Sequence, residues 1–106
     1  MLDLQNYQMP REKFIALGPE AMALEELLAI LLRTGRKGAS VLEVAHDVVE
    51  RMDHVVGGLN NATVETLREI EGIGQDKAVT ICAAIELGRR LGQMKVKQDW
   101  ADFSTP

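Results

Sequence analysis

Residues 67–81 read LREIEGIGQDKAVTI, and this segment predicts the feature that decides the fold, a tight corner between two helices. Apolar residues at helical spacing stand on both sides of the triplet Gly72-Ile73-Gly74. Glycine adopts left-handed backbone without steric cost, so Gly72 is predicted to end the first helix. Ile73 is predicted to point back between the two helices. The segment therefore predicts two amphipathic helices joined by a tight corner.

The corner is also a candidate anion site. Gly74 would open the second helix without a side chain, so that the N–H groups of the first turn stay reachable. These donors and the positive end of the helix dipole favour an anion, and Lys77 would add a charge-assisted contact to a phosphate. The carboxylates of Glu69, Glu71 and Asp76 oppose it. The pattern is typical of a helix-hairpin-helix, which resembles modules that hold a nucleic-acid backbone phosphate. The alternative is that the glycines only shape a turn.

A second candidate lies in the segment RTGRKGAS, residues 33–40. No acidic residue occurs between Glu26 and Glu43, so this is the most positive local stretch of the chain. Two glycines between two apolar helices would also fit a second, degenerate hairpin, while a solvated connecting loop explains the same residues equally well. The side chains that could contact a phosphate, or cap the helix that follows, are Arg33, Arg36, Lys37 and Ser40.

Helical periodicity covers most of the remaining chain. It predicts helices over about 11–17, 23–33, 41–52, 64–70 and 75–91. The helix over 23–33 is apolar enough to be central, with a stripe of Leu24, Leu27, Leu28 and Leu31. From Gly92 the periodicity fails, so the last helix should end near Leu91. The predicted fold class is all-α, a compact bundle of about five short helices that contains the helix-hairpin-helix.

Length and composition limit what such a chain can do. Its 106 residues have room for one core, and 46% hydrophobic with 26% charged residues is typical of a soluble globular protein. The net charge of −4 argues against strong polyanion binding, since duplex affinity comes largely from Lys and Arg. A nucleic-acid role must therefore rest on a local patch. With neither a signal peptide nor a long apolar run, the expected location is the cytoplasm.

The sequence nominates no catalytic residue. It has no Ser/His/Asp set, no Walker-type phosphate loop and no metal-ligand cluster, and Cys82 is its only cysteine. His46 and His54 have no acidic or Cys partner at ligand spacing. We therefore expect no enzyme activity, no cofactor and no metal.

Several ordered motifs resemble the N-terminal region of the RadC family of bacterial proteins over about residues 8–92. They are PREK at 10–13, GP-x-A at 18–21, ELLAILLRTG at 26–35, G-x-SVL at 38–42, GL at 58–59, I-x-GIG at 70–74 and ELGRR at 86–90. In that family a C-terminal domain similar to JAB/MPN metalloprotease-like domains follows, and its His-x-His-Pro-Ser-Gly motif and a downstream Asp would bind zinc. This chain has none of those residues. It also has Ala23-Leu24 where related sequences tend to carry Ser-Asp, a helix cap.

The resemblance implies three segments and a function. Residues 1–9 would be an N-terminal extension, 10–92 the helical domain, and 93–106 a linker or tail toward the C-terminal domain that this chain lacks. The family name implies DNA repair, and we expect a non-catalytic module that binds nucleic acid, with DNA the expected one, weakly and without sequence specificity. The candidate contacts are Gly72, Ile73, Gly74, Lys77, Arg33, Arg36, Lys37 and Ser40.

The net charge favours an alternative function. The chain would then be a protein-interaction or scaffold domain of a RadC-like protein with no direct DNA binding. Its acidic surface would face protein partners or the missing C-terminal domain.

Overall fold

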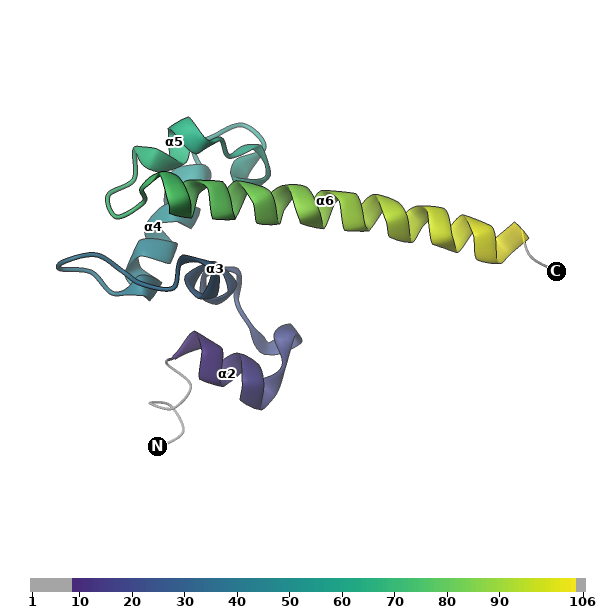
Figure 1. The fold of residues 1–106 in the computed structure, drawn as a ribbon, viewed down its shortest axis with the longest axis horizontal. Helices are drawn as coiled ribbons and strands as arrows, with labels where there is room; N and C mark the ends of the chain where they lie inside the picture. The colour runs from purple at the N-terminus through teal and green to yellow at the C-terminus, as the bar shows by residue number, and fades with distance from the viewer. Residues whose placement is uncertain (1–8, 105–106) are drawn as a thin grey trace.

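The computed structural model describes the backbone of residues 9–104 and the side chains of residues 9–94. Within these residues the secondary structure is helical without strands, which confirms the predicted all-α class. The elements are α2 (Pro10–Leu17), η1 (Pro19–Ala21), α3 (Leu24–Leu32), α4 (Val41–Met52), η2 (Gly58–Asn61), α5 (Val64–Arg68) and α6 (Gln75–Ser104), as Figure 1 shows. The predicted N-terminal extension, apart from Met9, lies outside the described residues.

The helix α3 lies at the centre, in contact with α2, α4 and α6. The core contains Leu28, Ala29, Leu32, Val44, Ala45, Val48, Met52, Leu67, Ile70, Ile73, Ala78 and Ile81. The predicted stripe of α3 was wrong in part, because the exposed fractions of Leu24 and Leu27 are 52% and 37%. A helix that is apolar on most sides can bury any of several stripes, and the positions of α4 and α6 decide which one is buried.

Local capping explains where two of the helices begin. The Ser40 hydroxyl accepts a hydrogen bond from the Glu43 amide at 3.2 Å, and the Glu43 carboxylate accepts one from the Ser40 amide at 2.8 Å. This reciprocal pair starts α4. The Thr63 hydroxyl accepts from the Thr66 amide at 3.1 Å and starts α5. Both caps confirm the predicted helix starts.

The helix α6 is longer than predicted. It continues through Gly92 to Ser104 and extends past the other helices, along the 58 Å long axis of the molecule (Figure 1). The predicted end near Leu91 was wrong because loss of apolar periodicity does not break a helix. One glycine costs about 1 kcal/mol relative to alanine, and no proline occurs between Pro19 and Pro106. The proposed domain boundary after residue 92 remains a prediction.

Candidate nucleic-acid interface

The corner between α5 and α6 has the predicted backbone. Gly72 has a φ of +93°, in the left-handed region that glycine tolerates. The amide of Ile73 donates to the Ile70 carbonyl at 3.0 Å, and the Ile73 side chain is 4% exposed, within the core. Ala78, one turn into α6, is fully buried where the helices meet. Ile73 therefore holds the corner from inside and presents no side chain to a ligand.

The first turn of α6 leaves its amides available. The Gly74 carbonyl accepts the first helical hydrogen bond, from the Ala78 amide at 3.0 Å. Gly74 is exposed, and a Cβ added there would have no atom within 4 Å. No described residue accepts a hydrogen bond from the amides of Gln75, Asp76 or Lys77. The start of α6 thus differs from the start of α4, where a carboxylate and a hydroxyl occupy the donors.

The two candidate segments lie against each other. A Cβ added to Gly72 would meet the aliphatic carbons of Arg36 at 3.1–3.3 Å. The Lys77 ammonium donates to the Thr34 carbonyl at 2.6 Å and to the Thr34 hydroxyl at 3.0 Å. Beside this contact is a groove of about 260 Å³, lined by Leu31, Leu32, Arg33, Thr34, Asp76, Lys77 and Thr80. Residues 43 positions apart in sequence therefore form one surface.

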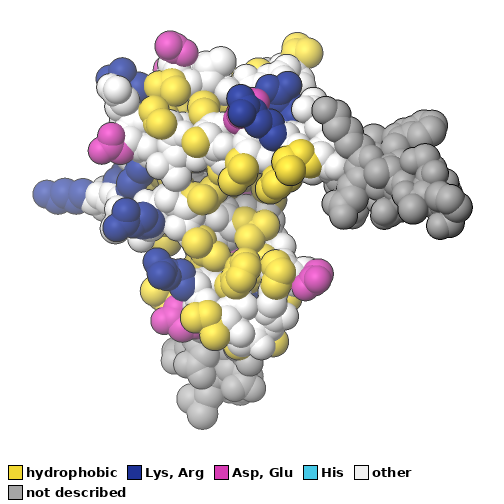
Figure 2. Space-filling model, turned by 45° about the vertical axis from the view of Figure 1, so that its right-hand side comes forward, with side chains coloured by type: hydrophobic (Ala, Val, Ile, Leu, Met, Phe, Trp, Pro, Cys, Tyr) yellow, Lys and Arg dark blue, Asp and Glu magenta, His cyan; other side chains and the backbone are white. Residues whose placement is uncertain are grey.

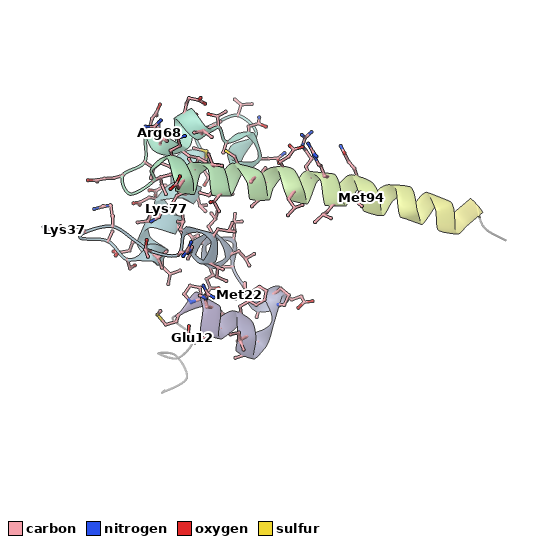
Figure 3. The ribbon with its side chains drawn as sticks, viewed as in Figure 1. Glu12, Met22, Lys37, Arg68, Lys77 and Met94 are labelled. Carbon is pink, nitrogen blue, oxygen red and sulfur yellow. The ribbon has the colours of Figure 1, made fainter. Side chains whose placement is uncertain are left out.

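The segment 33–40 is a closed turn. Arg36 and Ala39 exchange two backbone hydrogen bonds of 3.0 Å each. Gly35 has no room for a side chain, since a Cβ there would lie 2.3 Å from the Ala39 carbonyl oxygen. This turn presents Lys37 at its exposed tip, at the same end of the molecule as Lys77 (Figure 3).

The acidic residues near the corner are largely engaged by arginines. Glu69 forms an ion pair with Arg51 of α4, and Glu71 faces Arg36 at 3.6 Å. Exposed pairs of this kind add little stability, but each lowers the local negative charge. Segments 33–40 and 68–77 together with Arg51 carry six basic and three acidic residues, although the whole chain has a net charge of −4.

The cations that remain lie around the corner. Among the described residues, no carboxylate pairs with Arg33, Lys37, Arg68 or Lys77. Figure 2 shows several Lys and Arg side chains along one edge of the molecule, with Asp and Glu side chains among them. Four cations of segments 33–40 and 68–77 thus have no carboxylate partner among the described residues, although the whole chain has a net charge of −4.

Three predicted contacts already have partners within the chain, since Arg36 pairs with Glu71 and donates to the Lys37 carbonyl. Lys77 is bound to Thr34, and the amide and hydroxyl of Ser40 are occupied by Glu43. The hydrogen bond from the Ser40 amide, followed by that from its hydroxyl, holds the pKa of Glu43 below its usual value. Thr34 and Arg68 are two further residues of this surface that were not predicted from the sequence. Arg68 lies in the segment 67–81, next to Glu69. Only the structure shows that Glu69 forms its ion pair with Arg51 of α4, which leaves Arg68 without a carboxylate partner among the described residues.

The described side chains include no group of three or more His, Cys, Asp or Glu residues that could hold a metal ion. His46 is exposed, and its Nδ1 lies 2.5 Å from the Glu25 carboxylate of α3. In the part of the chain that the structure describes, no helix combines the length and the apolar character needed to cross a bilayer.

Comparison with protein families matches residues 1–79 to the family described as UPF0758 N-terminal. A UPF0758 protein of Thermotoga maritima is 51% identical over 83 residues, which cover 78% of this chain and 37% of that relative. UPF0758 proteins of a Geobacillus species and of Halalkalibacterium halodurans are 48% and 46% identical, over 87% and 88% of this chain and 40% of each relative. The chain thus spans about two fifths of the length of these curated relatives. No solved structure matches it.

Proposed function

The chain belongs to the UPF0758 N-terminal family, and on that basis we propose that it is a non-catalytic module that binds nucleic acid, DNA in the first instance, through backbone phosphates. The DNA-repair role implied by the resemblance to the RadC family is part of this proposal. The observation that carries it is the open first turn of α6. Amides of Gln75, Asp76 and Lys77 without a described acceptor lie beside a surplus of basic side chains. Backbone donors at a helix start, with nearby cations, favour a phosphate.

The contacts divide into two groups. The amides that follow Gly74 would bind one phosphate directly, with Gly72 and Ile73 holding their position. Arg33, Arg36 and Lys37 would face a neighbouring phosphate, and Ser40 would fix the base of their turn through its cap. Phosphate contacts position a protein without specifying bases, so no sequence preference is expected.

Binding should be weak. With two or three phosphates neutralised, affinity belongs toward or beyond the ~10⁻⁴ M end of the non-specific range and should fall as salt is added. The carboxylate of Asp76, which lies in the first turn of α6, lowers the affinity further. A weak module of this kind suits a protein in which other parts supply affinity through linkage.

The test is a titration of a fluorescent duplex in low salt with the parent chain and Lys77→Glu. The variant should bind at least tenfold more weakly, because it places a carboxylate beside the proposed phosphate. The matched control is Arg90→Glu, which makes the same charge change on the far half of α6 beside Glu86. A Lys77→Glu chain that binds as well as the parent would remove the corner from the proposal.

Lys77 also holds Thr34, so a Thr34→Val variant is needed as a structural control. This variant removes the hydroxyl acceptor but leaves the cation in place. It should keep most of the binding if the charge of Lys77 acts on the phosphate. Circular dichroism of each variant establishes that the helical content is unchanged.

One observation favours the alternative, a protein-interaction module. Large apolar side chains are exposed on α2 and along α6: Ile15 is 84% exposed, Leu87 59%, Leu91 53% and Met94 62%. Exposed apolar surface of this kind is typical of interaction sites when it is contiguous. The alternative predicts no mobility shift of DNA even at ~10 mM salt, where phosphate binding is strongest, together with concentration-dependent dimerisation in sedimentation experiments.

A further inference from the structure

Arg68, the last residue of α5, is a cation that neither the fold nor the sequence motif uses. It is exposed and has no hydrogen-bond or carboxylate partner among the described residues. The two acidic residues that follow it are directed elsewhere, Glu69 to Arg51 and Glu71 to Arg36. The charge of Arg68 is therefore not cancelled by the acids next to it in sequence.

The position of Arg68 relates it to the corner. It ends α5 four residues before Gly72, and α5 packs against α6. Successive residues of a helix point about 100° apart, so Arg68 cannot share the direction of Glu69, which reaches α4. Figure 3 places Arg68, Lys77 and Lys37 at the same end of the molecule, away from Met94. Cations from three separate segments thus lie at the end of the molecule where α6 begins.

We propose that Arg68 contacts a further phosphate of the same strand that the first turn of α6 holds. The ligand class is then a polynucleotide with consecutive phosphates, not a free phosphate or a mononucleotide. A single phosphate would need only the amides of α6 and one cation. A nucleic-acid strand carries one negative charge every ~3.4 Å along its axis, and cations on three segments match an extended anion of this kind. This inference rests on the proposed function and adds Arg68 to its phosphate contacts.

The experiment measures the salt dependence of binding to a fluorescent DNA duplex for the parent, Arg68→Gln and Arg68→Lys. Loss of one phosphate contact should make the slope of log affinity against log salt shallower by about 0.9. Arg68→Lys should keep the slope of the parent, because it keeps the charge. The matched control is Arg90→Gln, which also removes one arginine and should leave the slope unchanged.

Inorganic phosphate is the second probe, since it reports the single-anion site alone. With the duplex kept well below its Kd, phosphate should displace it from the parent and from Arg68→Gln at the same phosphate concentration, because the single-anion site is unchanged. A slope for Arg68→Gln equal to that of the parent overturns the role of Arg68 while the proposed function stands. A parent chain that binds no duplex at the lowest salt overturns the proposed function, and this inference with it.

Discussion

Two glycines determine how closely the two candidate segments approach each other. Gly35 lies where a Cβ would overlap the Ala39 carbonyl, so the basic turn closes only with glycine there. Gly72 combines a left-handed φ with the carbons of Arg36 directly over its Cα. Arg36 therefore uses its stem as packing and keeps its guanidinium near Glu71. Gly72 is therefore needed at this corner for two reasons: its backbone is left-handed, and the stem of Arg36 leaves no room for a side chain.

Gly72→Ala should destabilise the chain by about 1–2 kcal/mol, because an L-residue in left-handed backbone carries that cost. The added methyl would also displace the stem of Arg36. Chemical denaturation monitored by circular dichroism gives the free energy of unfolding. Gly88→Ala is the matched control, since its Cβ meets open space in helical backbone and should stabilise by up to ~1 kcal/mol or have no effect. Equal effects of the two substitutions would contradict the role of the corner.

Among the helices, α3 begins with an incomplete cap. Ala23 has no side-chain acceptor, and only half of a capping box is present, because the Glu26 carboxylate accepts from the Ala23 amide at 2.9 Å. Glu26 also accepts from Lys13 of α2 at 3.0 Å. The hydrogen bond from the Ala23 amide, supported by Lys13, holds the pKa of Glu26 below its usual value. One carboxylate thus starts α3 and ties it to α2.

Ala23→Ser should complete the box and stabilise the chain by about 0.5–2 kcal/mol. The new hydroxyl would accept from the amide of Glu26, which an alanine side chain cannot do. The midpoint temperature of thermal unfolding and the midpoint denaturant concentration of chemical unfolding should both rise, while the helical content should stay the same. Ala16→Ser, on the exposed part of α2, is the control and should give no stabilisation. A destabilised Ala23→Ser chain would contradict the capping geometry of α3.

Across the whole molecule, charge is unevenly distributed. The segments around the corner are cationic while the chain as a whole is acidic. Ion pairs between distant segments create this difference, since Arg51 and Arg36 engage Glu69 and Glu71 and leave other cations unpaired. A polyanion would therefore be attracted to one end of the molecule and repelled by the rest, which favours one orientation of binding over high affinity.

The contact between His46 of α4 and Glu25 of α3 predicts a pH dependence. The hydrogen bond with Glu25, then the charge of that carboxylate, raises the pKa of His46, and Glu50 and Asp47 act in the same direction. The stabilisation is complete below the pKa of His46 in the unfolded chain. It is lost as the pH rises through the higher pKa of the folded chain. His46→Gln should thus lower the unfolding midpoint at acidic pH and have a smaller effect at alkaline pH.

The titration of His46 by NMR tests the same contact directly. Its midpoint should lie above that of histidine in an unfolded peptide, and Glu25→Gln should lower it. A midpoint at or below the peptide value would show that the two side chains do not interact in solution.

Local chemistry already determined much of this structure. Apolar periodicity placed the helices, Ser40 and Thr63 marked two helix starts, and Gly72 marked the left-handed corner with Ile73 buried behind it. Each of these follows from preferences of a few neighbouring residues, so an isolated sequence is sufficient to predict them. The open first turn of α6 could also be predicted from neighbouring residues, because Gly74 has no side chain to cover it.

Contacts between distant segments could not be predicted in this way. The packing of α4 and α6 decided that α3 buries Leu32 together with the predicted Leu28, and leaves Leu24 and Leu27 exposed. It also brought Lys77 to Thr34, Arg36 onto Gly72 and Arg51 to Glu69, which joined two candidate segments and left Arg68 unpaired. Such contacts depend on how helices pack, because residues far apart in sequence become neighbours only when a shared core fixes the helix positions.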